Sequence, residues 1–307
     1  MSQSTYVIGH QQPDTDAIIS AIANARLKQA QGTDAVAARA GDLNPETEFV
    51  LDRWDVESPT LLADAADEKL MLVDHNEYSQ TVAGARKAAI TEVIDHHRIG
   101  DVTTGDPIFF HAEPLGSTAT ILTGLYDDAG VDIDESTAGL LLSGLLSDTV
   151  VLRSPTTTET DREVAERLAE IAGVDYEEYG KELLAKKSKL GEKSPREMVL
   201  GDFKEYDIGE DVLGIGQIET VEPEAVLEQR EAIVEAMDEV VAERGYAVLL
   251  VLVTDLLEEE STAFIAGDHT EAVSNALEAT FTDREAFLPG VMSRKKQVVP
   301  PVEDALK

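Results

Sequence analysis

Short apolar runs alternate with amphipathic segments through the first half of the chain, and this alternation constrains the fold more than any other feature. We expect strands over five of the runs: Tyr6–Gly9, Ala35–Ala38, Thr47–Leu51, Lys69–Val73 and Glu92–Ile94. Apolar residues recur at helical spacing over Ala17–Ala30, Ser117–Ala129, Ser136–Leu146 and Thr160–Ala172. Strands that alternate with helices are typical of βαβ units. The pattern therefore predicts an α/β fold with a mainly parallel sheet flanked by helices.

A second, smaller domain is predicted after a change of composition. Residues 186–196, KKSKLGEKSPR, hold five basic residues and one acidic residue in a chain that is otherwise poor in positive charge. We expect a linker there, a larger domain at 1–185 and a smaller mixed α/β domain at 197–307. Its expected strands are Val212–Gln217, Ala247–Val253 and Ala263–Ala266, and its expected helices are Pro223–Arg244 and Ala272–Ala279.

The charge of the chain limits its partners and its environment. With 61 acidic and 25 basic residues the formal net charge is −36, so the protein repels polyanions and we expect no nucleic-acid partner. An apolar content of 43% predicts a folded chain rather than a disordered one. Self-repulsion is screened at molar salt, where the Debye length is about 3 Å. We therefore infer a salt-rich cytosol, as in a halophile; the alternative is an ordinary acidic mesophilic protein.

Cysteine and long apolar segments are both missing from the sequence. Without cysteine, a metal ion would have to be held by oxygen and imidazole ligands. No apolar run approaches the ~20 residues of a membrane span, and no secretory leader is visible, so we expect a cytoplasmic protein with no membrane partner.

Histidine and aspartate residues gather just beyond the apolar runs. Four segments carry them: YVIGH with His10, Asp14 and Asp16; LMLVDH with Asp74 and His75; EVIDHH with Asp95, His96 and His97; and GLLLSGLLSDTV with Asp148. The tips of neighbouring parallel strands stand only ~5 Å apart, and ligands bind at the carboxyl ends of such strands. We therefore expect these loops to converge on one crevice.

The charge of that crevice suits two divalent cations. Four aspartates, Asp14, Asp16, Asp74 and Asp148, balance two such ions, and His10 and His96 add nitrogen donors. A set rich in oxygen favours Mn²⁺, Co²⁺ or Mg²⁺, although ligand type alone does not choose among them. Two ions roughly 3.5 to 4 Å apart can share a bridging water and activate it for phosphoryl displacement. The chemistry indicated is hydrolysis.

Each of these residues also has a simpler explanation when taken alone. Asp16 is well placed to cap a helix over Ala17–Ala30, Asp74 and Asp95 suit turns after strands, and Asp148 suits a cap. The histidines His75, His111 and His269 are more typical of packing or of the surface. These explanations do not account for the occurrence of all four loops in one chain.

Taken in order, the motifs GHQQPDTDA, LVDHNE, VIDHHR, LLSDTV and SRKKQVVP resemble those of the manganese-dependent, family II inorganic pyrophosphatases of the DHH phosphoesterase superfamily. The resemblance implies a DHH metal-binding domain followed by a DHHA2-like domain, with the active site between them. It also implies hydrolysis of pyrophosphate to two orthophosphates by a metal-bridging hydroxide, with two or more Mn²⁺ ions per subunit. A homodimer formed through the larger domain is implied as well.

The resemblance also implies roles for individual residues. His10, Asp14 and Asp74 would bind one ion, and Asp16, Asp74, His96 and Asp148 its neighbour, with Asp74 bridging and Asp148 near both. His97 would contact substrate and protonate the leaving phosphate, and Asp95 would orient an imidazole. The family loop usually has Asn where Gln12 stands, which puts only the loop geometry in question.

A positive cluster near the end of the chain would bind the phosphates. Ser293 is followed by three basic residues, and Arg294 and Lys295 resemble the family's substrate clamp, as does Lys204. Arg grips phosphate oxygens with a bidentate fork and Lys adds a point charge. A solvated tail is the alternative for this segment, and Lys296 receives no role. We expect the smaller domain to close over substrate through the linker.

Two alternative functions differ from pyrophosphate hydrolysis, the first in its substrate and the second in lacking catalytic activity. One is a DHH-type phosphodiesterase or exopolyphosphatase acting on short oligonucleotides or polyphosphate, but its Gly-Gly-Gly-His type of signature is missing from this sequence. The other is a sensor that binds metal and phosphate without turnover. The ligand set beside a phosphate clamp favours pyrophosphate hydrolysis over both.

Overall fold

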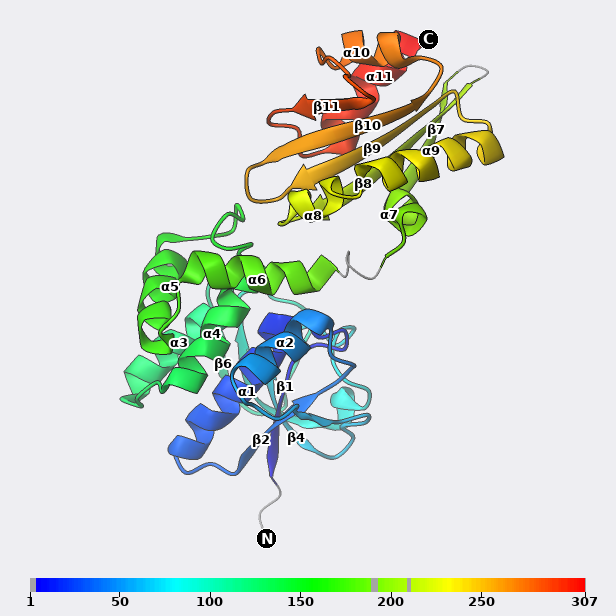
Figure 1. Ribbon diagram of the computed structural model, residues 1–307. Helices are drawn as coiled ribbons and strands as arrows, with labels where there is room; N and C mark the ends of the chain where they lie inside the picture. The colour runs from blue at the N-terminus through cyan, green and yellow to red at the C-terminus, as the bar shows by residue number, and fades with distance from the viewer. Residues whose placement is uncertain (1–3, 189–192, 209–210, 307) are drawn as a thin grey trace. The chain divides into compact units, whose positions relative to one another are not determined.

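Figure 1 shows the computed structural model of the chain, which describes residues 4–188, 193–208 and 211–306. The chain divides into two compact units, Met1–Lys187 and Ser188–Lys307. Each unit is built around its own sheet, one of six strands and one of five. The predicted class, a two-domain α/β fold, is confirmed.

The first unit contains a six-stranded sheet in the order β3-β2-β1-β4-β5-β6, with every strand pair parallel. Its strands are β1 (Thr5–Ile8), β2 (Ala35–Arg39), β3 (Thr60–Leu61), β4 (Lys69–Val73), β5 (Ala89–Asp95) and β6 (Phe109–Ala112). The chain adds β2 and β3 on one side of β1, then places β4 on the other side. The order of the strands therefore reverses between β1 and β4, where open α/β sheets bind their ligands.

Helices in the first unit carry further residues to that end of the sheet. They are α1 (Thr15–Ala30), α2 (Pro45–Arg53), a short 3₁₀ turn (Ala85–Lys87), α3 (Thr118–Ala129), α4 (Glu135–Asp148), α5 (Glu159–Ala172) and α6 (Tyr176–Ser188). α1, α3 and α4 pack against one another. Every residue of α4 from Thr137 to Ser147 is buried, as expected for a helix that is largely apolar around its circumference.

Helix α2 corrects a prediction. The sequence predicts a strand over Thr47–Leu51, but these residues are helical. The Asn44 side chain accepts the N–H of Thr47 and caps the helix, and Pro45 occupies the first turn, where its fixed φ suits a helix. The strand prediction followed the β-branched and aromatic side chains in the run. Capping and proline override that propensity here.

The second unit contains a mixed five-stranded sheet in the order β11-β10-β9-β8-β7. Its strands are β7 (Phe203–Ile208), β8 (Asp211–Thr220), β9 (Val248–Asp255), β10 (Glu260–Gly267) and β11 (Glu285–Leu288). β8 and β9 are parallel, and the other pairs are antiparallel. The helices are α7 (Pro195–Gly201), α8 (Pro223–Leu227), α9 (Arg230–Arg244), α10 (Thr270–Ala276) and α11 (Val299–Leu306), with a π-helical segment at Arg294–Val298.

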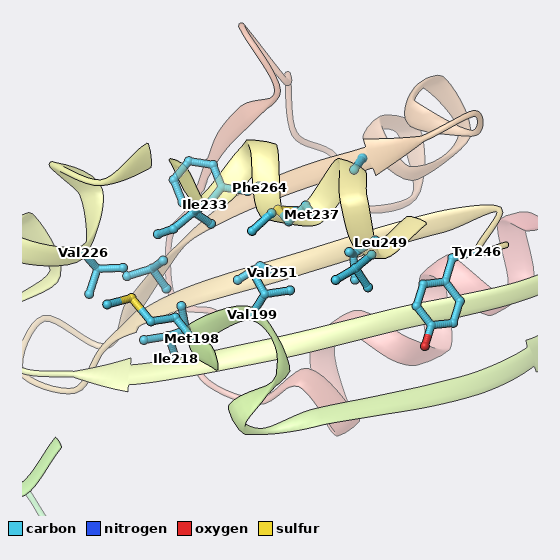
Figure 2. Packing of buried hydrophobic residues seen from close by; sticks show 14 residues of the cluster. Met198, Val199, Ile218, Val226, Ile233, Met237, Tyr246, Leu249, Val251 and Phe264 are labelled. Atoms are coloured by element: carbon cyan, nitrogen blue, oxygen red, sulfur yellow. The ribbon is translucent and has the colours of Figure 1, made fainter. Parts of the chain in front are cut away.

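Both faces of the second sheet are covered by apolar side chains. Successive residues of a strand point to opposite faces, and in β9 Leu249 and Val251 pack with Met237 and Phe264 in the cluster drawn in Figure 2. Leu250 and its neighbours belong to a second cluster with residues of α10 and α11. The continuous apolar run of β9 is therefore buried throughout, which explains why it shows no alternation.

Two predicted segments differ in detail from the structure. The helix expected over Pro223–Arg244 is divided into α8 and α9, and no Gly or Pro marks the interruption. The expected linker at 186–196 is helical at both described ends, because α6 runs to Ser188 and α7 begins at Pro195 with a capping box. Residues 189–192 lie outside the described residues, and the domain bounds remain a prediction. Within the described residues, no helix has the length and apolarity to cross a membrane.

Candidate metal centre

The predicted ligands lie at the carboxyl ends of three adjacent strands. β1 is hydrogen-bonded to β4, and β4 to β5. His10 follows β1, Asp74 follows β4 directly, and His96 follows β5. Asp74 adopts a left-handed conformation with φ of 62°, which aspartate tolerates better than most residues. The chain reversal between β1 and β4 thus positions the first two of these side chains at the switch point of the sheet.

All six predicted metal ligands come together in two groups that share one carboxylate. In the first group Nε2 of His10 lies 3.6 Å from Oδ2 of Asp14 and 3.6 Å from Oδ2 of Asp74. The second group consists of Asp16, Asp74, His96 and Asp148, with its ligand atoms within 4.8 Å of one another. Asp74 belongs to both groups, and a third candidate group joins it to His96 and His97. This is the arrangement that a bridging carboxylate requires.

His96 is oriented by a backbone carbonyl. Its Nδ1 lies 3.0 Å from the carbonyl oxygen of Leu115, so Nδ1 carries the proton that it donates there. Nε2 then lies 3.5 Å from Oδ1 of Asp74 and 3.4 Å from Oδ2 of Asp148. A ligand histidine typically donates its other ring N–H in this way. Leu115 was not singled out from the sequence, where a carbonyl partner leaves no signal.

Asp16 does not cap α1, so the simpler explanation of this residue is wrong. The cap is Asp14, whose Oδ1 accepts the N–H of Ala17 at 3.0 Å. Asp16 is fully buried, and its two oxygens accept the N–H groups of Thr118 (2.7 Å) and Ala119 (3.1 Å) at the start of α3. A Cβ on Gly144 would lie only 2.6 Å from Oδ1 of Asp16. Glycine is therefore needed where α4 passes this carboxylate.

Two further residues hold the ligands and the neighbouring histidine in place. The hydroxyl of Thr118 donates to Oδ1 of Asp74 at 2.9 Å. The amide of Asn76 donates to Oδ2 of Asp95, and Oδ1 of Asp95 accepts from the backbone N–H (3.0 Å) and Nδ1 (2.8 Å) of His97. Asp95 thus orients an imidazole, as predicted, and that imidazole is His97. Thr118 and Asn76 were missed because threonine and asparagine are too common in loops to be informative alone.

Burial and the concentration of carboxylates shift the pKa values of His10, Asp16, Asp74 and His96. Burial lowers the pKa of His10, but Asp14 and Asp74 outweigh it and raise the pKa to about 10. The pKa of His96 is likewise raised to about 10, against burial, by Asp148, Asp16 and Asp74. Burial, reinforced by neighbouring carboxylates, raises the pKa of Asp74 to about 6 and that of Asp16 well above its usual range. The cluster therefore attracts positive charge.

The donor set fits divalent cations. Oδ2 of Asp74 and Nε2 of His96 are buried and have no hydrogen-bond partner among the described residues, which is costly for polar atoms. Both atoms face the other members of their groups. Oxygen ligands with two imidazoles suit Mn²⁺ and its harder neighbours. Cations would satisfy both atoms and replace the protons that the raised histidine pKa values imply.

The remaining histidines of the first unit pack or pair elsewhere. His75 is buried beside His10, with Nδ1 2.9 Å from the carbonyl of Val73 and Nε2 3.1 Å from the hydroxyl of Thr81. Burial lowers the pKa of His75 to about 4, so this imidazole is neutral. His111 on β6 lies beside Glu113. Neither belongs to a ligand group within the described residues, and in the second unit His269 is exposed.

The predicted phosphate-binding residues lie in the second unit. Lys204 and Lys295 are exposed. Arg294 is only 6% exposed, and its guanidinium donates to the carbonyls of Asp202 (2.6 Å) and Ile215 (3.0 Å) and to Oδ1 of Asp202 (2.9 Å). Ile215 is the β8 partner of Lys204, so the two predicted segments are neighbours. Arg294 ties them together, a contact the sequence did not predict.

The two units match two family models. Residues 4–145 match the DHH family, N-terminal domain, and residues 181–305 match the DHHA2 domain. A "Manganese-dependent inorganic pyrophosphatase" of Methanothrix thermoacetophila is 41% identical over all of both chains. A "Probable manganese-dependent inorganic pyrophosphatase" of Bacillus pumilus is 43% identical over 98% of this chain and 99% of its own.

Solved structures are similar over nearly the whole chain. A putative family II inorganic pyrophosphatase of Methanococcus jannaschii has 42% identity and a TM-score of 0.62, with 98% of this chain and 99% of that chain covered. An exopolyphosphatase-related protein of Bacteroides fragilis has a TM-score of 0.52 at 15% identity, with 99% and 92% covered. At that identity the second likeness concerns the fold alone.

Proposed function

The chain belongs to the manganese-dependent, family II inorganic pyrophosphatases, and from this membership and the geometry of its metal centre we propose how it works. It is an enzyme that hydrolyses inorganic pyrophosphate to two orthophosphates, with Mn²⁺ as its cofactor. The observation that carries the proposal is the pair of ligand groups joined at Asp74. A phosphoanhydride substrate brings several negative oxygens, which such a centre can neutralise.

Six residues hold the manganese in this proposal. His10, Asp14 and Asp74 bind one ion, and Asp16, Asp74, His96 and Asp148 bind the other, in agreement with the two groups of donor atoms. When bound, the ions neutralise charge on the phosphate oxygens and lower the pKa of water. The contribution of the chain is to hold the donors in place, through the α3 N–H groups on Asp16 and the Thr118 hydroxyl on Asp74. Asp148 is essential to turnover because it is one of the residues that bind the second ion.

His97 is the acid that serves the leaving phosphate. Its side chain is 54% exposed, and Nδ1 is held by Asp95. The hydrogen bond to Asp95 raises the pKa of His97 despite partial burial, which favours the protonated imidazolium. With Nδ1 engaged, Nε2 is the nitrogen that donates to a phosphate oxygen. A proton held there lowers the cost of expelling phosphate.

Lys204, Arg294 and Lys295 bind the phosphates of the substrate. The exposure of both lysines and the proximity of their segments within the second unit support this assignment. In the described structure Arg294 also holds Asp202 and the β8 backbone. We assign Arg294 two tasks, maintaining this part of the second unit and supplying positive charge near Lys295.

The decisive test compares substrates on the metal-loaded protein. Metal-stripped protein is returned to Mn²⁺ at high salt. Phosphate release is then measured from pyrophosphate and from long polyphosphate, and nucleotide release from a short oligoribonucleotide. We expect pyrophosphate to be hydrolysed much faster than the other two. Comparable rates on polyphosphate or on the oligoribonucleotide would favour a phosphodiesterase or exopolyphosphatase. Tight Mn²⁺ binding without any turnover would favour a sensor.

We also propose that the enzyme is a homodimer formed through the first unit. β6 is an edge strand of the six-stranded sheet, and Phe109 and Phe110 on it are 47% and 39% exposed. An unpaired edge that carries exposed aromatic side chains invites pairing with a second copy. Phe110→Glu should convert a dimer to a monomer in light scattering. A monomeric wild-type protein would exclude this assembly.

A cytoplasm rich in salt is the proposed location. The net charge of −36 supports the high-salt part of this proposal, because such self-repulsion is tolerated best where salt screens it. The cytoplasmic part remains a prediction from the sequence. Activity measured against KCl concentration would decide the first part, since a halophilic enzyme requires the salt and an ordinary one does not.

A further inference from the structure

Glu46 is a fully buried carboxylate to which the proposed function gives no task. It lies in the first turn of α2, and its side chain has 0% exposure. Its Oε2 accepts hydrogen bonds from two hydroxyls, that of Thr15 at 2.7 Å and that of Ser147 at 2.9 Å. Burying a carboxylate is costly unless it is hydrogen-bonded in this way.

The two hydroxyl donors stand next to proposed metal ligands. Thr15 separates Asp14 from Asp16 at the start of α1, and Ser147 precedes Asp148 at the end of α4. A single oxygen atom of α2 therefore joins the two helix ends that deliver three of the six ligands. These helix ends are about 130 residues apart in sequence, so only the folded chain brings them together.

We propose that Glu46 is a positioning residue for the manganese centre, which it serves by fixing the start of α1 against the end of α4. The inference rests on the proposed function, because it takes Asp14, Asp16 and Asp148 to be metal ligands. Hydrogen bonds to a carboxylate are shorter and stronger than those between neutral groups. They hold Thr15 and Ser147, and hence the backbone beside each ligand, at a set separation. Glu46 itself is in none of the ligand groups found among the described residues.

A second contact from α2 acts on the same threonine. Oγ1 of Thr15 lies 3.1 Å from Oγ1 of Thr47, so α2 holds Thr15 at two points. Within the segment Asn44–Thr47, the Asn44 side chain caps α2, and the Glu46 side chain contacts Thr15 at the start of α1. Groups that hydrogen-bond a ligand side chain directly change metal affinity by roughly 10- to 100-fold when they are removed. Glu46 acts on the residues beside the ligands, so we expect its effect to lie at the lower end of that range.

The test measures Mn²⁺ affinity apart from turnover. Free Mn²⁺ gives a six-line EPR signal that vanishes on binding, and its loss yields a binding isotherm for the full-length protein. We expect Glu46→Ala to weaken Mn²⁺ binding about 10-fold, the lower end of the range for direct partners of ligands. Glu46→Gln keeps an acceptor oxygen for the two hydroxyls, so it should recover most of the affinity.

Glu92→Ala is the matched control. Glu92 is a buried carboxylate of the same unit, but it accepts from Asn24 (2.8 Å) and Lys28 (2.5 Å), neither of which adjoins a proposed ligand. Both alanine variants should lower the melting temperature of the metal-free protein. Glu92→Ala should change Mn²⁺ affinity less than about threefold, as expected for an independent site. Equal loss of affinity in the two variants would reduce Glu46 to a general stabilising role and overturn the inference.

Ser147→Ala provides a milder variant should Glu46→Ala fail to fold. It removes one hydroxyl from Oε2 and should weaken Mn²⁺ binding by less than Glu46→Ala does. Where Glu46→Ala folds, the effects of Ser147→Ala and Glu46→Ala on Mn²⁺ affinity should not add in a double-mutant cycle, because both variants act on one contact. Additive effects, or unchanged affinity in Ser147→Ala, would overturn the inference. A wild-type protein that binds Mn²⁺ but leaves pyrophosphate intact would instead count against the proposed function.

Discussion

The hydroxyl of Thr118 donates a 2.9 Å hydrogen bond to Oδ1 of Asp74. The backbone N–H of the same residue donates to Oδ2 of Asp16 at 2.7 Å. The first residue of α3 therefore contacts two carboxylates of the second ligand group, one of which is shared with the first. The start of a helix also favours negative charge, because its N–H groups and dipole point toward it. α3 thus offsets part of the repulsion between buried aspartates.

Thr118→Val should weaken Mn²⁺ binding while preserving the fold. Valine has nearly the shape of threonine, and the backbone N–H to Asp16 remains, so only the bond to Asp74 is lost. We expect affinity to fall roughly 10- to 100-fold. Thr118→Ser keeps the hydroxyl and should bind Mn²⁺ nearly as well as the wild type. Calorimetric titration measures both, and equal losses in the two variants would show that the methyl group, rather than the hydroxyl, is what matters.

Binding of Mn²⁺ should release protons. In the metal-free protein the pKa values of His10 and His96 are raised to about 10, so both are protonated at pH 8. Ligand histidines must be neutral, and up to about two protons per subunit should therefore leave. Affinity should rise with pH until it approaches these pKa values, and should fall as pH decreases. Titrations in buffers of different ionisation enthalpy measure the protons. A binding heat independent of buffer at pH 8 would exclude this linkage.

The six proposed metal ligands could be selected from the sequence because they lie in loops just beyond apolar runs or close an apolar helix. In a parallel sheet such positions meet at one edge, and the structure brings them together there. The helical state of Thr47–Leu51 was missed because propensity favoured a strand, although Asn44 and Pro45 carried the signal. The simpler explanation of Asp16, as the cap of α1, is wrong because the cap is Asp14; both residues stand near the helix start, and only the backbone geometry distinguishes them.

The residues that hold the ligands were beyond prediction for a different reason. Thr118, Asn76 and Glu46 contact segments 19 to about 100 residues away in sequence. Such pairings depend on how helices pack, and a lone threonine, asparagine or glutamate has many other uses. Hydrophobic periodicity reports which face of an element is buried, but it carries no information on which hydroxyl meets which carboxylate.

Arg294→Ala and Lys295→Ala should have separable effects. Arg294 is buried and makes three hydrogen bonds to Asp202 and Ile215, so its loss should destabilise the second unit by about 2–4 kcal/mol. Lys295 is exposed, and its replacement should change stability by less than about 0.5 kcal/mol. Both should raise KM for pyrophosphate. Melting curves and steady-state kinetics make the comparison. Unchanged KM in Lys295→Ala would remove this residue from the substrate site.

Stability should increase with salt. At a net charge of −36, repulsion between exposed carboxylates opposes folding, and raising the ionic strength from 0.1 M to 1 M shortens the Debye length from about 10 Å to about 3 Å. The urea concentration at the midpoint of unfolding should therefore rise from 0.1 M to 1 M KCl and continue to rise toward 3 M. The measurement is made with and without Mn²⁺, because bound metal also stabilises the first unit. A midpoint that is flat or falls with KCl would show that the acidic surface does not require salt.

Glu235→Gln should stabilise the protein at low salt and weaken its salt dependence. Glu231, Glu235 and Glu239 are exposed and lie four residues apart on α9, where like charges at this spacing repel by about 0.2–0.5 kcal/mol per pair. Glu235 belongs to two such pairs. Glu243→Gln is the matched contrast, because Glu243 is paired with Arg196 and its removal also breaks that ion pair. At 0.1 M KCl we expect a higher urea midpoint for Glu235→Gln than for wild type, no comparable gain for Glu243→Gln, and a Glu235→Gln difference that disappears at 3 M. A gain that persists at 3 M would have to come from helix propensity rather than from charge.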